Sequence, residues 1–416
     1  MKILFLTLEY PPQKGGVASY YFGMVEELKR QGYEVDVIFN DGAHWNNPSQ
    51  PPLTLRGGNL LGWMWPRWLK GYYIVRRALK KQKYDVLFVG HLLPLGTVAY
   101  LLRRKIPYVI FTHGMDVLMA QNSWRKKWIA RKVFEHAKLI VANSEFTKGV
   151  VEEIGVAPER VRRRELSLAI PQTAVVYPCP NMVSDVKLEQ VEVLRRKLGL
   201  VGKKVLLTLG RVVPRKGHDL VLRALPEILE HVPETVYVIA GVGADLGRLQ
   251  GLVNGAGVAS ESPGSAEDPR YNRDSRRRTL SGATPYIAQG LQSAVRFVGA
   301  ISDEERAAYF ALCDLFVMPS RQIGPDVEGF GIVYLEAAIF GKPSIGGQSG
   351  GIAEAILDGK TGALVDPADP SAFARVTVQL LRDDAQCYEL GQNAKARVLH
   401  EFRWEKQVQE LLRALE

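Results

Sequence analysis

Short apolar runs alternate with amphipathic segments of helix length along the first part of the chain. Strands inside a parallel sheet are buried on both faces and read as continuous hydrophobic runs. Five runs have this character: KILFLTL (2–8), VDVIF (35–39), DVLFVG (85–90), YVIFTH (108–113) and LIVANS (139–144). The segment 19–32 has helical apolar spacing and ends at Gly32, a natural helix terminus. The alternation predicts a doubly wound, Rossmann-like α/β domain over residues 1–178.

The same alternation restarts after residue 181 and predicts a second Rossmann-like α/β domain over residues 182–401. Further strands are expected at 204–211, 235–241, 295–300, 315–320, 342–347 and 361–366. Helical segments such as 219–232 and 330–341 lie between them. Pro178 and Pro180 stiffen the segment between the two domains, which we interpret as the linker.

Two segments differ from this alternation. The helix expected at about 404–415 is apolar on one side, and we expect residues 402–416 to pack back across the boundary onto the first domain. Residues 254–293 are rich in Gly, Ser, Pro and Arg and have little periodicity, so we interpret them as an irregular insertion. The insertion is either an inert surface loop or, through the basic run 276–278, a contact for an anionic partner.

The charge balance narrows the range of partners. The chain has 54 Lys and Arg against 44 Asp and Glu, a formal net charge of +10, which favours phosphates, nucleic acids or an acidic membrane. The basic residues are scattered and form no nucleic-acid-binding module, so we expect no nucleic acid partner. Cys179, Cys313 and Cys387 are too widely spaced for a disulfide framework or a zinc site, which indicates a reducing cytoplasm.

The apolar runs also bear on localisation. The first run is ended by Glu9 and two prolines, which predicts a strand and not a signal peptide. No run approaches the roughly 20 apolar residues that span a bilayer, so we expect a cytoplasmic protein. Residues 60–81 and 124–132 place Trp and Tyr beside Lys and Arg, which suits peripheral binding to the inner face of an anionic membrane. The alternative is a solvated helix face with aromatic residues in the core.

One turn in each domain combines features that suit a phosphate. Gly15 and Gly16 follow the first strand and open a helix, where free backbone amides attract phosphate. Arg211 and Lys216 follow the strand 204–211, at the sheet edge where α/β proteins bind ligands. An Arg fork and a Lys point charge suit a diphosphate. The alternatives are a plain strand-to-helix turn and a solvated basic turn.

The strongest motif is DVEGFGIVYLE at residues 326–336. We expect Glu328 in a loop, the amides of 329–332 at a helix N-terminus, and Glu336 two turns further. Eight helical residues span about 12 Å, roughly the separation of two hydroxyl-bearing rings joined by a pyrophosphate. Carboxylates accept hydrogen bonds from vicinal diols, and amides bind the phosphates between them. The motif therefore outlines a nucleotide-sugar site, the alternative being one surface acid and one acid beside the core.

A histidine ends the fourth strand of the first domain. His113 lies in the motif THGMD, at a strand end that can face the cleft between the domains. A structural histidine is the alternative. Asp116 either orients the ring or caps a helix.

The motifs GGVASY, THGMD, GRVVPRKG and DVEGFGIVYLEA, in this order, resemble the family 4 retaining glycosyltransferases of the GT-B fold. The resemblance covers the chain from Met1 to about Trp404, apart from 254–293. The segment GKPSIGGQSGGIAEAI that follows the paired glutamates is most similar to bacterial members that build lipid-linked or surface glycans, including some mannosyltransferases.

The resemblance implies a GDP- or UDP-hexose donor and a role for each motif. His113 would contact the transferred hexose, Glu328 its hydroxyls and Glu336 the ribose, with the base near Ile301. The expected catalytic residues are His113, Arg211, Lys216 and Glu328. The expected donor-binding residues are Gly15, Gly16, Arg211, Lys216, Ile301, Glu328, Phe330, Gly331, Ile332 and Glu336.

The resemblance also implies transfer of mannose or a similar hexose, with retention, to a lipid-linked or glycan acceptor. The sequence has no pair of aspartates two residues apart, and we expect Arg211, Lys216 and a helix N-terminus to stabilise the leaving diphosphate without a metal or other cofactor. No suitably placed nucleophilic carboxylate is visible, which favours departure and attack on one face of the sugar.

The sequence leaves other functions open. A nucleotide-sugar epimerase or hydrolase would have the same fold. A catalytically silent glycan-binding scaffold would not need the paired glutamates together with Arg211 and Lys216. A dinucleotide oxidoreductase is disfavoured because neither domain has the glycine fingerprint with an acid about 20 residues later.

Overall fold

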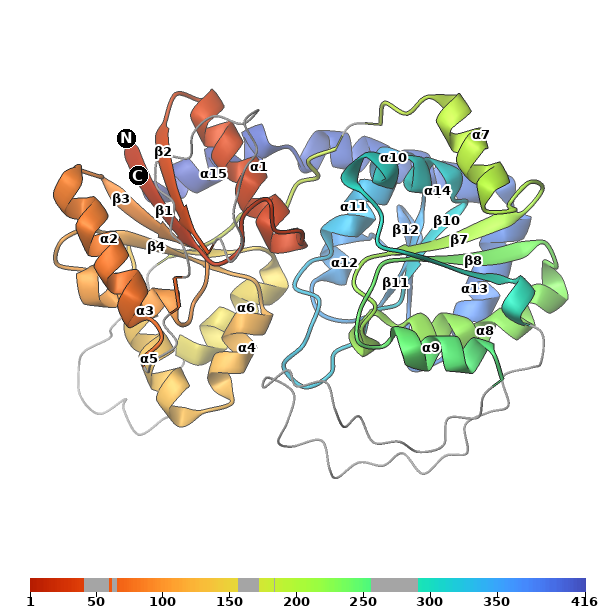
Figure 1. The fold of residues 1–416 in the computed structure, drawn as a ribbon, viewed down its shortest axis with the longest axis horizontal. Helices are drawn as coiled ribbons and strands as arrows, with labels where there is room; N and C mark the ends of the chain where they lie inside the picture. The colour runs from red at the N-terminus through yellow and green to blue at the C-terminus, as the bar shows by residue number, and fades with distance from the viewer. Residues whose placement is uncertain (41–59, 62–65, 156–171, 183, 256–290) are drawn as a thin grey trace.

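Two six-stranded parallel sheets form the centres of two lobes that lie side by side (Figure 1). This computed structural model describes residues 1–40, 60–61, 66–155, 172–182, 184–255 and 291–416. The core of the expected insertion, residues 256–290, lies outside the described residues, so its interpretation stays a prediction.

The first sheet has the strand order β2-β1-β3-β4-β5-β6. Its strands are β1 (Lys2–Thr7), β2 (Glu34–Phe39), β3 (Val86–Val89), β4 (Tyr108–Thr112), β5 (Leu139–Ala142) and β6 (Thr173–Val175). All paired strands are parallel. The order changes direction between β1 and β3, and α/β sheets bind ligands just past the carboxyl ends of strands at such a point.

The second sheet has the order β12-β11-β10-β7-β8-β9, also with all paired strands parallel. Its strands are β7 (Lys204–Leu209), β8 (Thr235–Ala240), β9 (Val295–Gly299), β10 (Leu315–Met318), β11 (Ser344–Gly347) and β12 (Gly362–Val365). The change of direction falls between β7 and β10. The predicted pair of doubly wound α/β domains is therefore confirmed.

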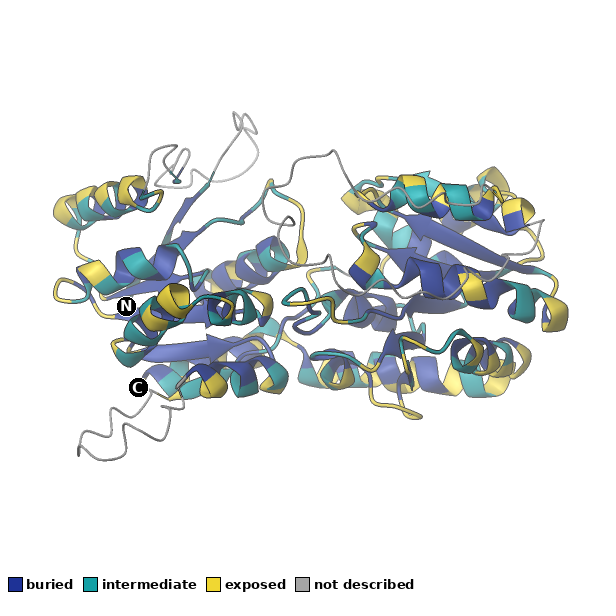
Figure 2. Cartoon of the chain, turned by 90° about the horizontal axis from the view of Figure 1, so that it is seen from below, coloured by how far each residue is buried: buried dark blue, intermediate teal, exposed yellow. Residues whose placement is uncertain are grey.

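Helices cover both sheets and leave the strands buried (Figure 2). The first lobe has α1 (Gly16–Arg30), α2 (Leu69–Lys81), α3 (Leu95–Leu102), α4 (Met115–Gln121), α5 (Trp124–Glu135) and α6 (Glu145–Gly155). The later helices are α7 (Leu188–Lys197), α8 (His218–His231), α9 (Leu246–Val253), α10 (Asp303–Leu312), α11 (Ile332–Ile339), α12 (Ile352–Ala355), α13 (Pro370–Arg382), α14 (Asp384–Glu401) and α15 (Trp404–Leu415). Every residue of β3, β4, β5 and β8 is buried, which is why the strands read as continuous apolar runs.

The C-terminal helix packs back on the first lobe, as predicted. Its apolar side joins the core that includes α1 and the first sheet, through Val408, Leu411 and Leu415. At the start of α15, the Trp404 indole N–H donates to Asn181 Oδ1. A Cβ at Gly23 of α1 would lie 2.1 Å from Trp404 Nε1, so only glycine lets α15 approach α1 this closely.

Candidate active site

Loops from both lobes converge at the carboxyl ends of the strands where each sheet changes direction. In the second lobe the loops follow β7 and β10, and in the first lobe they follow β1, β3 and β4. The loop after β10 lies close to the end of β4, because a Cβ added at Gly329 would lie 2.3 Å from the His113 carbonyl oxygen. Ser144 Oγ also donates to the Gly329 carbonyl across 2.6 Å. The structure thus brings the regions of His113 and Glu328 together.

A buried ion-pair cluster joins the loops after β7 and β10. Arg215 Nη1 and Lys216 Nζ both lie 2.6 Å from Glu328 Oε2, and Arg215 Nε lies 2.8 Å from Asp326 Oδ1. The Arg215 and Lys216 side chains are only 6% and 11% exposed. We call Arg215, Lys216, Asp326 and Glu328 the ion-pair cluster. Lys216 and Glu328 were expected in the site, whereas Arg215 and Asp326 were not.

The cluster keeps its carboxylate charged although it is removed from water. Burial raises the pKa of Glu328, but the nearby Lys216 and Arg215 outweigh it and hold the pKa at about 2. Burial lowers the pKa of Lys216, and the Glu328 carboxylate opposes that shift. An ammonium held in a partly desolvated loop interacts more strongly with an anionic ligand than one in bulk water.

Arg211 is not one of the four residues of the ion-pair cluster. It lies two residues after the end of β7 and is exposed. Its positive charge contributes to lowering the pKa of Lys216 and also that of Glu9 at the end of β1. Arg211 is therefore close enough to influence charged groups of both lobes.

The helix α11 begins four residues after Glu328, at Ile332. Gly331 adopts φ 93° as its N-cap, a left-handed conformation that favours glycine, and Phe330 is buried in the second lobe's core. Because α11 begins only at Ile332, Glu336 lies little more than one turn into the helix. The expected two helical turns between the glutamates are therefore wrong, although both side chains belong to one continuous loop and helix.

Glu336 is ion-paired with a residue that the sequence did not single out. The Arg306 guanidinium of α10 contacts Glu336 Oε2. Ser302 forms a capping box with Glu305 at the start of α10, which fixes the helix one turn before Arg306. Burial raises the pKa of the Glu336 carboxyl, and Arg306 counteracts this shift.

The glycines of the first lobe face α11. Gly15 is the N-cap of α1 and Gly16 is its first residue, and both are exposed. A Cβ at Gly16 would lie 3.6 Å from Ile332 Cγ2, so the starts of α1 and α11 approach each other. Ile301, expected near the base, follows β9 and packs partly buried against the second lobe's core.

His113 occupies a buried aromatic and polar surrounding. Its backbone N–H donates to Asp116 Oδ1 across 2.9 Å, so Asp116 fixes this turn, and its ring Nε2 contacts the Tyr21 hydroxyl. Burial lowers the pKa of His113 to about 4, which keeps the imidazole neutral near pH 7. Glu9, used in the sequence analysis only as the end of a strand, lies with Oε1 3.7 Å from His91 Nε2, and His91 lowers the pKa of Glu9.

The residues that sequence reasoning missed share one property: their partners are distant in sequence. Arg215 meets a carboxylate 113 positions away, and Tyr21 meets a histidine 92 positions away. The only local sign of these residues was a charged or hydroxyl-bearing side chain in a segment that is otherwise expected to be buried. Among the described residues, no three His, Cys, Asp or Glu side chains gather into a potential metal site.

Solved structures show which known fold the two lobes form. Anabaena Alr3699/HepE in complex with UDP superposes with a TM-score of 0.69 at 19% identity, covering 100% of this chain and 99% of that chain. Sucrose-phosphate synthase from Thermosynechococcus elongatus superposes with a TM-score of 0.72 at 22% identity, covering 99% and 97%. The two facing Rossmann-like lobes are those of the GT-B fold.

Sequence comparisons identify the family of the chain. The family model described as Glycosyltransferase Family 4 matches residues 14–163, and the model described as Glycosyl transferases group 1 matches residues 190–261 and 286–397. A GDP-mannose-dependent alpha-(1-6)-phosphatidylinositol monomannoside mannosyltransferase of Mycolicibacterium smegmatis is 28% identical, covering 97% of this chain and 95% of that protein. The chain belongs to the family 4 glycosyltransferases of the GT-B fold and is a mannosyltransferase-like glycosyltransferase.

Proposed function

We propose that this glycosyltransferase moves mannose or a similar hexose from a GDP- or UDP-sugar to a lipid-linked or glycan acceptor, with retention and without a metal ion. The observation that carries the proposal is the ion-pair cluster beside the contact between Gly329 and His113. It combines cations suited to a diphosphate with a carboxylate suited to sugar hydroxyls, next to a neutral imidazole.

The donor would lie with its diphosphate between the loops after β7 and β10. Lys216 supplies a point charge, Arg211 an exposed guanidinium, and the first amides of α11 further donors. Arg215 stays with Glu328 and Asp326 when Lys216 turns to the phosphate, so the hexose-binding carboxylate keeps its charge. Glu336, about one turn into α11, would accept hydrogen bonds from the ribose hydroxyls.

The transfer step breaks the bond between the anomeric carbon and the phosphate oxygen and forms one to the acceptor oxygen. The departing diphosphate keeps the bonding electron pair and takes the acceptor's proton on the same face. Lys216 and Arg211 stabilise its growing negative charge. The neutral His113 lies beside the hexose without adding a positive charge to the oxocarbenium-like carbon.

The relatives support the identity of donor and acceptor at the level of class. The Mycolicibacterium smegmatis protein is named as GDP-mannose-dependent and acts on a phosphatidylinositol monomannoside, and a solved structure with the same fold contains UDP. A mannolipid acceptor and synthesis of a surface glycolipid or polysaccharide follow as the function to test.

The test is incubation of the purified full chain with GDP-mannose, UDP-glucose or UDP-galactose and a glycolipid acceptor, followed by mass spectrometry and NMR of the product. The proposal expects an α-linked hexose on the acceptor and full activity after treatment with EDTA. A β-linked product contradicts retention, and loss of activity with EDTA contradicts metal independence. Release of free hexose, or a changed sugar on the nucleotide, with no acceptor modified would favour a hydrolase or epimerase.

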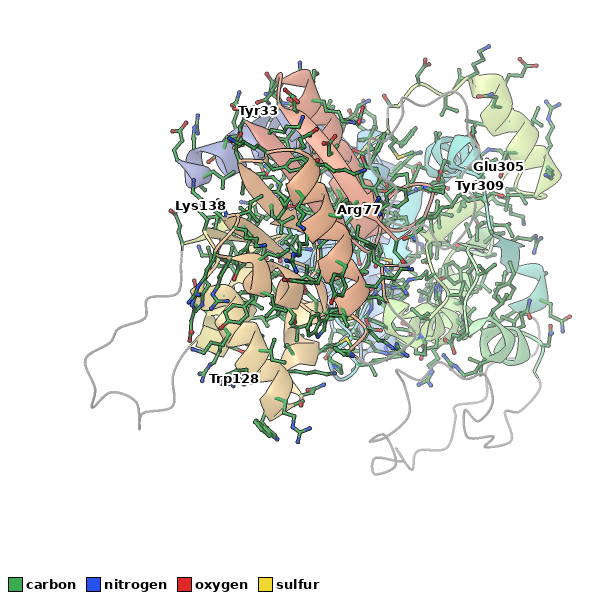
Figure 3. The ribbon with its side chains drawn as sticks, turned by 60° about the vertical axis from the view of Figure 1, so that its left-hand side comes forward. Tyr33, Arg77, Trp128, Lys138, Glu305 and Tyr309 are labelled. Carbon is green, nitrogen blue, oxygen red and sulfur yellow. The ribbon has the colours of Figure 1, made fainter. Side chains whose placement is uncertain are left out.

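We also propose that α5 binds an anionic membrane surface. Trp124 and Trp128 are 76% and 58% exposed, and Arg125 and Lys126 are exposed beside them; Figure 3 shows Trp128 on α5 at the edge of the first lobe. Exposed indoles next to cations match the chemistry of a negatively charged bilayer interface. None of the helices in the described parts of the chain is long and apolar enough to cross a bilayer.

The second membrane segment from the sequence analysis contributes less. In residues 60–81, Trp68 and Tyr72 pack against the first lobe's core, whereas Tyr73 is 58% exposed. Trp63 and Trp65 lie outside the described residues. The interpretation of these aromatics as core residues therefore holds for Trp68 and Tyr72.

Vesicle co-sedimentation tests the membrane proposal. We expect binding to phosphatidylglycerol-containing vesicles that weakens with salt and is reduced in Trp124→Ala and Trp128→Ala. Tyr388→Ala is the matched control, because Tyr388 is 68% exposed on α14 of the other lobe. Equal sedimentation of all three variants, or none of the wild type, contradicts the proposal.

A further inference from the structure

The hydroxyl of Tyr21 forms a buried link between α1, the end of β3 and His113. Tyr21 is fully buried on the face of α1 that covers the first sheet. Its hydroxyl contacts both the Gly90 carbonyl oxygen, just after β3, and His113 Nε2. A Cβ at Gly90 would lie 2.8 Å from the Tyr21 ring, so the absence of a side chain there allows the contact.

The number of protons in this link determines the tautomer of His113. The Gly90 carbonyl can only accept a hydrogen bond, and the Tyr21 hydroxyl has one proton to donate. When that proton is donated to Gly90, the hydroxyl can only accept from the histidine. His113 must then carry its proton on Nε2, which leaves Nδ1 as an acceptor. Among the residues that the structure describes, Nδ1 has no hydrogen-bond partner.

The surroundings hold the ring in this arrangement. The Tyr20 ring meets the His113 ring edge-on at 5.5 Å between centroids, and the Tyr21 ring meets it at 5.3 Å. The charged and titratable groups that face His113 are Asp116, His91 and Glu9, in addition to the two tyrosines. Burial raises the pKa of Tyr21 well above its usual value, so its hydroxyl stays protonated.

We propose that Tyr21 is a positioning residue that holds His113 in the Nε2–H tautomer, so that Nδ1 accepts a hydrogen bond from a hydroxyl of the transferred hexose. The inference rests on the proposed function for its catalytic consequence, whereas the tautomer follows from the protein alone. The neutral imidazole accepts this hydrogen bond and so fixes the orientation of the hexose. Because it is uncharged, it does not repel the positive charge that develops on the anomeric carbon.

The full chain carrying Tyr21→Phe provides the test, with Tyr20→Phe as the matched control. Tyr20 is a buried neighbour whose hydroxyl donates to the Val176 carbonyl across 3.0 Å and does not bond to the histidine. The tautomer is measured by 15N NMR of protein labelled at histidine, with His113→Asn used to assign the signal. Activity is measured as kcat and as the KM of the donor.

We expect wild-type His113 to give a protonated Nε2 and a bare Nδ1 at pH 7. Tyr21→Phe should mix the two tautomers and lower kcat about three- to tenfold, the effect of one hydrogen bond, with little change in donor KM. Tyr20→Phe should leave both the tautomer and kcat close to those of the wild type.

A wild-type signal from the Nδ1–H tautomer or the imidazolium overturns the inference even if Tyr21→Phe fails to fold. An unchanged tautomer and kcat in folded Tyr21→Phe overturns it as well. If the wild type shows the expected tautomer but transfers no hexose to any acceptor, the proposed function fails and the positioning of His113 by Tyr21 stands.

Discussion

Replacing Glu328 with glutamine removes the negative charge shared by Arg215 and Lys216 while preserving the size of the side chain. The pKa of Glu328 in the folded protein is about 2, against a usual value of 4.5. At about 1.4 kcal/mol per pKa unit, the ionised carboxylate contributes on the order of 3 kcal/mol to the free energy of unfolding at neutral pH. Glu328→Gln is expected to lose a stability of this order.

The sign of the pH dependence follows from the direction of the shift. A carboxyl whose pKa is lowered by folding stabilises the protein above the pKa of the unfolded chain, and this stabilisation disappears as pH falls toward the folded-state pKa. The difference in unfolding free energy between the wild type and Glu328→Gln should therefore be constant from pH 8 to about pH 5.5. It should shrink by roughly 1.4 kcal/mol at pH 3.5.

Urea denaturation followed by circular dichroism at pH 7 and pH 3.5 measures both quantities. Glu34→Gln is the control, because Glu34 also lies 2.6 Å from a lysine but is 72% exposed, and surface pairs contribute little. A variant as stable as the wild type at pH 7, or a stability difference that does not change with pH, would refute the reasoning about the ion-pair cluster.

Three further predictions concern the donor site, the packing of α15 and the contact between lobes. Glu336→Gln should weaken binding of a nucleoside diphosphate severalfold but leave binding of inorganic pyrophosphate unchanged, as measured by calorimetry; equal losses for both would argue against a ribose contact. Gly23→Ala should lower the melting temperature by several degrees because the methyl group would overlap Trp404. The control Gly149→Ala in α6, where an added Cβ would have no heavy atom within 4 Å, should raise the melting temperature slightly. A lower melting temperature for Gly149→Ala than for Gly23→Ala would contradict the packing of α15 on α1. Glu354 accepts the first backbone amides of α6 from across the lobe boundary, so Glu354→Gln should increase the radius of gyration in X-ray scattering, and an unchanged value would show that this contact does not hold the lobes together.

The sheets were predictable because their strands are buried on both faces. A continuous apolar run such as 85–90 or 108–113 is typical of a buried parallel strand when helical segments lie on either side of it. The strand β6 was missed because it has three residues, all only partly buried, next to the linker. Its place in the sheet depends on pairing with β5, which no local pattern records.

Only those residues of the candidate site that belong to short, continuous sequence motifs could be predicted. Lys216 and Glu328 belong to recognisable loops, but their ion pair spans 112 positions. The role of Arg306 could not be predicted for the same reason, because its partner Glu336 lies 30 positions later and on another helix. The helix start at Ile332 depends on the left-handed Gly331, so the spacing of the two glutamates could not be derived by assuming a continuous helix.

The proposed transfer requires that the diphosphate of a nucleotide sugar bind beside Lys216. Isothermal titration of the full chain with GDP and UDP tests it most directly, in the wild type, in Lys216→Met and in Lys203→Met, an exposed lysine just before β7. We predict that one of the two nucleotides binds the wild type and Lys203→Met equally well, and that Lys216→Met binds it ten- to a hundredfold more weakly, the loss of one charge-assisted contact. Equal affinity of Lys216→Met and the wild type would contradict binding of the diphosphate by Lys216.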